Sequence, residues 1–151
     1  MDFNSFFQIL IASIVATSAM TLFSYAVSES FRELYKEPVL LTFILKSINI
    51  EVSDKSKKII AWLLHYAIGF GFVLAYHFLW SHNILTISIV NAFLLGAISG
   101  IIGIIGWVIM FKVSNFKPSI DFKGYYLQLF FAHVIFGLVA TFTYSIFNNF
   151  I

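Results

Sequence analysis

Four long apolar segments constrain the fold of this chain more than any other feature. They cover about residues 6–27, 57–80, 85–112 and 125–147, and each reaches the roughly 20 residues that a helix needs to cross a bilayer. Of the 151 residues, 60% are hydrophobic and only 11% are charged, whereas a soluble domain carries about 25% charged residues. We therefore predict one all-α domain, residues 1–151, that is an integral membrane four-helix bundle with the lipid bilayer as its main partner.

The positive charges predict how this bundle is oriented. All nine Lys and Arg residues lie in two connections or at the segment ends beside them, one connection between the first and second segments and one between the third and fourth. The N-terminus, the middle connection and the C-terminus contain none. Because short cytoplasmic loops are enriched in Lys and Arg, the two basic connections are predicted to be cytoplasmic and both termini to lie outside.

The first basic connection contains a shorter apolar run, PVLLTFILKSINI, that starts at Pro38. Proline suits the first position of a helix, and the run is too short to span a membrane. We predict a short helix in this cytoplasmic loop, for which two placements are open. It is either an interfacial helix in the headgroup region or a loop helix packed on the bundle.

A histidine, a glycine and a tyrosine recur at the same spacing in the second and fourth segments. The two sets are His65, Gly69 and Tyr76, and His133, Gly137 and Tyr144. On a helix, the members of each set share one stripe. Each half of the chain thus reads as span, basic loop, span, which predicts a 2+2 parallel internal repeat about an axis along the membrane normal.

The repeat predicts two polar layers across the bundle. At 1.5 Å per residue, His65 and His133 lie roughly 10–12 Å from the cytoplasmic edge, and the two tyrosines lie about 16 Å further out. Met20 and Trp107 are expected near the depth of the histidines. Ionisable residues within membrane spans are costly and often functional, so the histidine layer is the candidate site.

Three uses of these histidines are open. Each could donate a hydrogen bond to a neighbouring helix as a purely structural contact. His65 and His133 could ligate a haem b from its two sides. They could also form a metal or proton site, because histidine binds transition metals and titrates near neutral pH. No Asp or Glu lies in any of the four segments, so a proton site is expected to lack an acidic partner.

Other polar residues of the spans are expected to have plainer roles. His77 and His82 lie near the outer interface, where a solvated side chain is the simpler interpretation. Asn91 is expected to donate a hydrogen bond to another helix.

Glycines mark the expected helix-packing faces. Gly96, Gly100 and Gly103 share one face of the third segment, and such small-residue faces let helix backbones approach closely. Gly69 and Gly137 are expected to serve the same purpose. The glycine face of the third segment could act inside the bundle, or it could contact a second copy or another membrane subunit.

The remaining motifs argue against several functions. The chain has no cysteine, which excludes disulfides and thiolate sites. It lacks the HExxH, GxSxG and Walker signatures, so we predict no catalytic residues. The chain also lacks a basic patch combined with exposed aromatic residues, the pattern that would indicate a nucleic-acid partner.

Four motifs together resemble a group of small four-helix bacterial inner-membrane proteins that has no assigned activity. They are SxxATxxMTLFSY, REL followed by KEPVLL, HYxxGxxFxxxYHxLW and GxxGIIGW. The resemblance covers most of the chain and implies the architecture and the bacterial inner membrane, but no mechanism. We expect a non-enzymatic scaffold or a transport- or complex-associated subunit. The alternatives are a haem or quinone-linked electron carrier and a proton or metal conduit.

Overall fold

The protein is all-helical in its computed structural model, which describes residues 3–48 and 50–148. These residues form five helices and no strand. The helices are α1 (Phe3–Phe31), α2 (Glu37–Ser47), α3 (Asp54–Ser81), α4 (Ile89–Val113) and α5 (Phe122–Asn148). All except α2 are long and apolar enough to cross a membrane. The predicted all-α fold with four helices able to span a membrane is therefore confirmed, and it fits a multi-pass membrane protein.

The long helices match the predicted segments but extend beyond most of their ends. The exception is α4, which was expected from residue 85 and begins at Ile89. Ser88 caps this helix by accepting a hydrogen bond from the backbone N–H of Asn91. The Asn91 side chain donates to the backbone oxygen of Thr86 at 2.8 Å. The prediction that Asn91 bonds to another helix is therefore wrong, because its amide closes the turn before its own helix.

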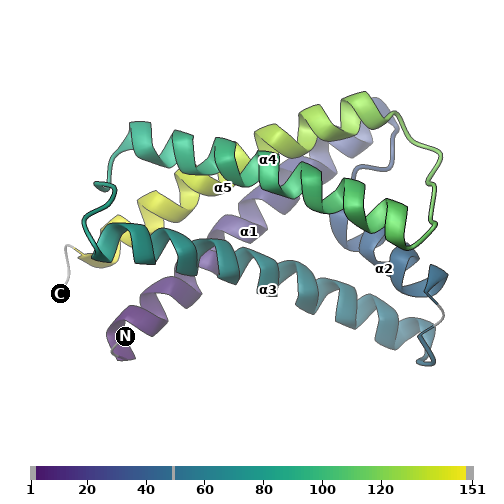
Figure 1. The fold of residues 1–151 in the computed structure, drawn as a ribbon, viewed down its shortest axis with the longest axis horizontal. Coiled ribbons are helices and arrows are strands. Elements are labelled where there is room, and N and C mark those ends of the chain that lie inside the picture. The colour runs from purple at the N-terminus through teal and green to yellow at the C-terminus, as the bar shows by residue number, and fades with distance from the viewer. Residues whose placement is uncertain (1–2, 49, 149–151) are drawn as a thin grey trace.

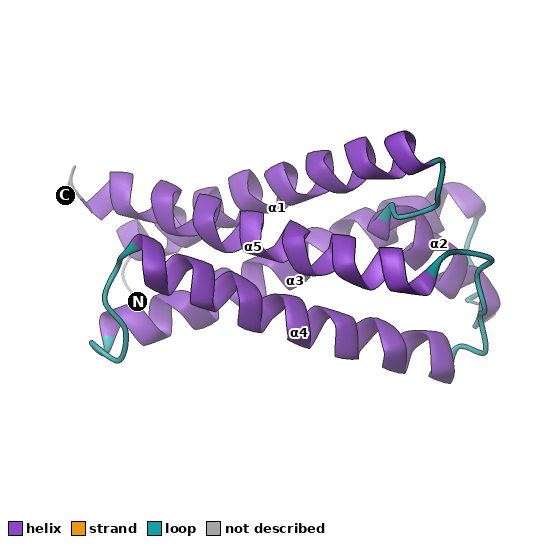
Figure 2. Cartoon of the chain, turned by 90° about the horizontal axis from the view of Figure 1, so that it is seen from above, coloured by secondary structure: helices purple, strands orange, loops and turns teal. Residues whose placement is uncertain are grey.

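The long helices pack in a definite set of pairs. α5 packs against α1 and α4, and α3 packs against α1 and the short α2. The turn between α3 and α4 lies at one end of the bundle (Figures 1 and 2). The loops before and after α2, and the loop between α4 and α5, lie at the opposite end. All nine Lys and Arg residues belong to these loops or to the helix turns beside them.

Glycine allows α4 and α5 to approach until their backbones touch. A Cβ atom on Gly96 would lie 2.7 Å from the backbone oxygen of His133 and 2.8 Å from the Cα of Val134. A Cβ on Gly137 would lie 2.6 Å from the Cα of Gly96. Gly100 likewise faces Phe130 of α5. The glycine face of α4 is thus covered by α5 of the same chain, and a second copy or another subunit would need a different surface.

The segment that leads into α2 turns back into the bundle. Arg32 adopts a left-handed backbone conformation with φ of 54°. The Ser28 hydroxyl then donates to the backbone oxygen of Glu33 and accepts from the backbone N–H of Tyr35. Pro38 lies in the first turn of α2, as expected for a helix start.

Helix α2 is packed on the bundle, as in the second of its two predicted placements. Its apolar face is buried through Leu40, Leu41, Ile44 and Leu45. Its first residue, Glu37, is buried as well, with only 2% of its surface exposed. The returning loop therefore places a carboxyl group among the long helices.

The backbone contact at Gly96 predicts that one methyl group added at this position destabilises the fold. We expect Gly96→Ala to lower the free energy of unfolding by about 1–3 kcal/mol, because a helix backbone cannot move aside as a side chain can. Gly71→Ala is the matched control, since a Cβ there meets nothing within 4 Å. Thermal unfolding in detergent, followed by circular dichroism, would measure both variants. Equal unfolding temperatures for the two variants would contradict the packing of α4 on α5.

Candidate functional site

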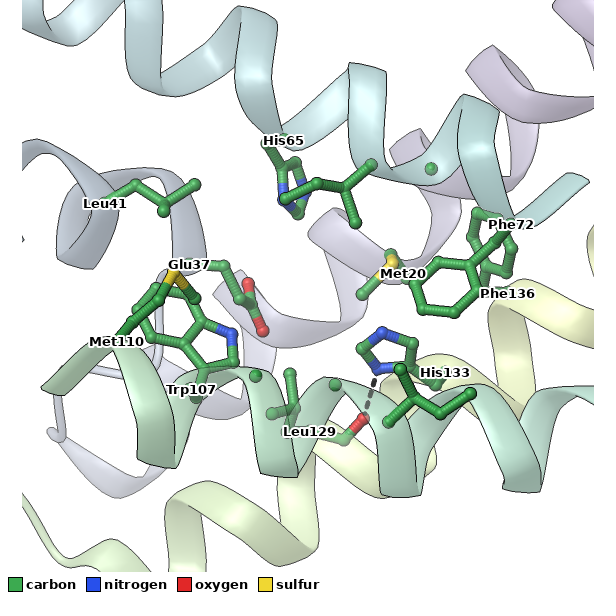
Figure 3. Close-up of a pocket in the computed structure, with 15 residues that line it drawn as sticks. Met20, Glu37, Leu41, His65, Phe72, Trp107, Met110, Leu129, His133 and Phe136 are labelled. Atoms are coloured by element: carbon green, nitrogen blue, oxygen red, sulfur yellow. Dashed lines mark hydrogen bonds between the residues drawn. The ribbon is translucent and has the colours of Figure 1, made fainter. Parts of the chain in front are cut away.

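A cavity of about 190 Å³ lies inside the bundle and is lined by residues of all five helices. Met20, His65, Trp107 and His133, predicted from sequence to share one depth, all line it (Figure 3). Gly69 and Gly103 line it too. The other walls are mainly apolar, and Glu37 is the remaining ionisable side chain among the lining residues.

His133 presents a bare nitrogen to the cavity. Its Nδ1 lies 2.9 Å from the backbone oxygen of Leu129, and a carbonyl oxygen can only accept, so Nδ1 carries the hydrogen. In the neutral ring, Nε2 then holds the lone pair. The ring packs against α4, where a Cβ on Gly103 would lie 2.9 Å from Nε2. The glycine thus leaves room for the imidazole between α4 and α5.

His65 is held in the opposite tautomer. Its Nε2 lies 2.9 Å from the hydroxyl oxygen of Thr21, and that hydroxyl donates to the backbone oxygen of Thr17 at 2.6 Å. With the hydroxyl hydrogen used in this way, Nε2 donates and Nδ1 holds the lone pair. Each histidine therefore donates its single N–H to a neighbouring group, and its other ring nitrogen remains a hydrogen-bond acceptor.

Glu37 is the third polar group of the cavity. Its Oε1 accepts from the Ser24 hydroxyl at 2.8 Å and, more weakly, from Gln128 Nε2 at 3.5 Å. Gln128 also donates to the Ser24 hydroxyl at 2.5 Å. The other oxygen, Oε2, is buried and has no hydrogen-bond partner in the part of the chain that the structure describes. In Figure 3 the carboxyl group points into the cavity, between the two imidazoles and Trp107.

Burial dominates the acid–base behaviour of Glu37. It raises the pKa of this carboxyl group from the ordinary 4.5 to about 7, against the opposing effects of hydrogen bonds from its own backbone, Ser24 and Gln128. The charged form loses its hydration, and these donors reach only one of the two oxygens. Near neutral pH, the group is thus divided between its protonated and ionised forms.

Glu37 is the site residue that the sequence analysis missed. It was assigned to a loop, and the histidines were expected to lack an acidic partner; that expectation is wrong. Ser24 lies seven residues before the end of α1 and Gln128 six residues after the start of α5, which is roughly 9–10 Å inside those helix ends. The polar side chains of Ser24 and Gln128 within two apolar spans were the available signal that a polar partner lies between them.

The tyrosines of the second layer form separate contacts and do not line the cavity. The Tyr76 hydroxyl lies 2.6 Å from Ser99 Oγ of α4. The Tyr144 hydroxyl lies 2.6 Å from Nδ1 of His77. His77 therefore forms a hydrogen bond with α5, and the prediction that it is a solvated side chain is wrong. His82 is exposed, as expected.

The residues present do not fit a haem or a bound metal ion. Thr21 already occupies Nε2 of His65, and about 190 Å³ is below the roughly 300–1,000 Å³ of pockets that take drug-sized ligands. Among residues 3–48 and 50–148, no three His, Asp or Glu side chains lie close enough to hold a metal ion. The cavity instead suits a proton or a small organic group.

Comparisons of the chain with protein-family models, with curated proteins and with solved structures find no match.

The buried carboxyl group predicts how stability depends on pH. Between pH 4.5 and about 7, the folded state keeps a proton that the unfolded chain has released, so stability falls as pH rises. The total decrease in the free energy of unfolding is about 3 kcal/mol, and it is complete above the pKa that Glu37 has in the folded state. Glu37→Gln resembles the protonated form at every pH and removes most of this slope.

Thermal unfolding in detergent between pH 5 and pH 8 would measure this slope. Glu51→Gln is the control, because Glu51 is an exposed carboxylate in the same loop region and should keep the wild-type profile. Parallel profiles for wild type and Glu37→Gln would show that burial does not perturb Glu37.

Proposed function

We propose that the protein is a non-enzymatic, transport-associated component of the bacterial inner membrane that binds and releases a proton at Glu37 inside its helical bundle. The observation that carries the proposal is the buried, unbonded Oε2 of Glu37, which faces a cavity shared with His65 and His133. A buried carboxyl group with one unsatisfied oxygen destabilises the fold, so a purely structural role does not account for it.

The charge distribution supports the orientation within this proposal. The nine basic residues gather at the end of the bundle that holds the loops around α2 and the α4–α5 loop. By the positive-inside rule, that end faces the cytoplasm and both termini face outward. Glu37 and the histidines then lie nearer to the cytoplasmic face than to the outer one.

The groups around Glu37 suit proton exchange. Four titratable side chains face it from the packed helices: Tyr25 of α1, His65 of α3, and Tyr125 and His133 of α5. α4 contributes Trp107, which does not titrate. With a pKa of about 7, Glu37 gains and loses its proton over the physiological range, and the two imidazoles offer lone pairs to the same cavity.

The packing of the histidines also supports a 2+2 internal repeat. His65 on α3 bonds to Thr21 of α1, and His133 on α5 packs against Gly103 of α4. Each histidine thus contacts the other long helix of its own half of the chain. The repeat would have brought two proton acceptors to one cavity, to which α2 adds the acid.

Infrared difference spectroscopy of the protein in lipid nanodiscs tests the proton site. Between pH 6 and pH 8, we expect a protonated-carboxyl band to disappear with a midpoint near pH 7. Glu37→Gln should abolish this band, whereas Glu51→Gln should leave it unchanged because Glu51 is exposed. A wild-type spectrum in which no carboxyl group titrates in this range would refute the proposal.

A further inference from the structure

We propose that the cavity receives the ammonium head of a small lipophilic amine, which enters sideways from the bilayer and takes the place of the proton on Glu37. This inference rests on the proposed function in that Glu37 must be able to ionise. It adds the chemical class of the ligand and its route.

The route is indicated by the gap in helix packing. α3 packs against α1 and α2, whereas α4 packs against α5. The described residues show no extended packing between α3 and α4, although Tyr76 of α3 bonds to Ser99 of α4 further from the basic end. Ile68 of α3 and Ile102 of α4 both line the cavity, yet they are 49% and 50% exposed. They therefore form its mouth on the outer surface of the bundle.

The depth and chemistry of this mouth select a lipophilic ligand. Ile68 lies 14 residues into α3 and Ile102 lies 11 residues before the end of α4, which is roughly 16–21 Å from the cytoplasmic helix ends. At that depth, the surface faces hydrocarbon. A molecule that enters between two isoleucines must therefore partition into the bilayer first.

The polar groups inside select a cation that donates hydrogen bonds. The available groups are Oε2 of Glu37 and the lone pairs of His65 and His133, all of which are acceptors. A primary ammonium brings one positive charge for the Glu37 carboxylate and N–H donors that can each bond to a separate acceptor, so it does not require all three groups to converge on one atom as a metal ion does. An anion would meet the Glu37 carboxylate, and a bare metal ion would find no group of three ligands among the described residues.

The size and the walls fit such a head group. Phe72 and Trp107 supply aromatic rings around the cavity, and aromatic faces attract ammonium ions. The volume of about 190 Å³ exceeds the roughly 150 Å³ of an engineered apolar cavity that binds benzene. Benzylammonium therefore has a suitable shape and charge as a probe.

The exchange balances in protons and involves no redox step. Protonated Glu37 loses H⁺, its carboxylate pairs with the incoming ammonium, and the released proton leaves the cavity. Because one proton competes with one amine, affinity should fall about tenfold for each pH unit below the Glu37 pKa of about 7. Protonation of either histidine in acid would act in the same direction.

Isothermal titration of the protein in nanodiscs with benzylammonium at pH 8 and pH 6 tests the proposal. We expect saturable binding that is about tenfold weaker at pH 6 and, at pH 6 to 7, a heat that depends on the buffer because protons are released. Benzyl alcohol, which has the same shape without the charge, should bind at least tenfold more weakly. Equal binding of amine and alcohol would overturn the proposal.

Three variants locate the site. Glu37→Gln should weaken benzylammonium binding at pH 8 by at least tenfold. Gly106 lines the cavity, and a Cβ there meets nothing within 4 Å, so Gly106→Leu should fill the space and abolish binding without unfolding the protein. Gly71→Leu is its matched control, since Gly71 also has open space but does not line the cavity. Wild-type affinity in Gly106→Leu would overturn the proposal.

The failure of this inference differs from the failure of the proton site. If the infrared band of Glu37 titrates near pH 7 but benzylammonium does not bind, the amine site is refuted and the proton site stands. If the amine binds without releasing a proton and Glu37 shows no titration, the exchange and the proton site are both refuted.

Discussion

The hydrogen-bond cluster of Glu37, Ser24 and Gln128 is the interaction on which the α2 end of this bundle depends. Within a bilayer, water is not available to satisfy a polar group, so a buried carboxyl group must find donors on neighbouring helices. Ser24 and Gln128 supply them from α1 and α5, which fixes where α2 enters. The cluster thereby joins α1 and α2, which are consecutive in the chain, to the distant α5, and it leaves one oxygen of Glu37 for the cavity.

Close backbone contact on one side of the bundle makes the cavity on the other side possible. The glycines of α4 and α5 let these helices touch, and Gly69 similarly brings α3 against Thr17 of α1. α4 is held by α5, and α3 is held by α1 and α2, whereas α3 and α4 share no extended packing and are joined by the hydroxyl of Tyr76, which bonds to α4 beyond the cavity. The cavity lies in the space that remains, and its opening faces the direction in which packing is weakest.

The chemistry of the cavity follows from how each polar side chain is satisfied. Both histidines donate their one N–H to a fixed acceptor, so their lone pairs remain for the interior. Glu37 accepts on one oxygen only. The result is a site of acceptors within apolar walls, which favours protons and hydrogen-bond-donating cations over anions, and which is too small for a haem.

The sequence by itself determined the helical class and the number of segments able to cross a membrane, because length and hydropathy set these directly. It also predicted that Met20, His65, Trp107 and His133 share one level, since helical rise converts position along a span into depth, and all four line the same cavity. Three features were decided only by the tertiary structure. They are the burial of Glu37, the pairing of His77 with Tyr144, and the use of the α4 glycines within one chain. The physical reason is the same for all three: hydropathy records how apolar a segment is, but not which face of a helix meets which neighbour or whether a loop turns back among the spans. Those outcomes depend on hydrogen bonds and backbone contacts between residues far apart in the chain, such as the 91 positions that separate Glu37 from Gln128.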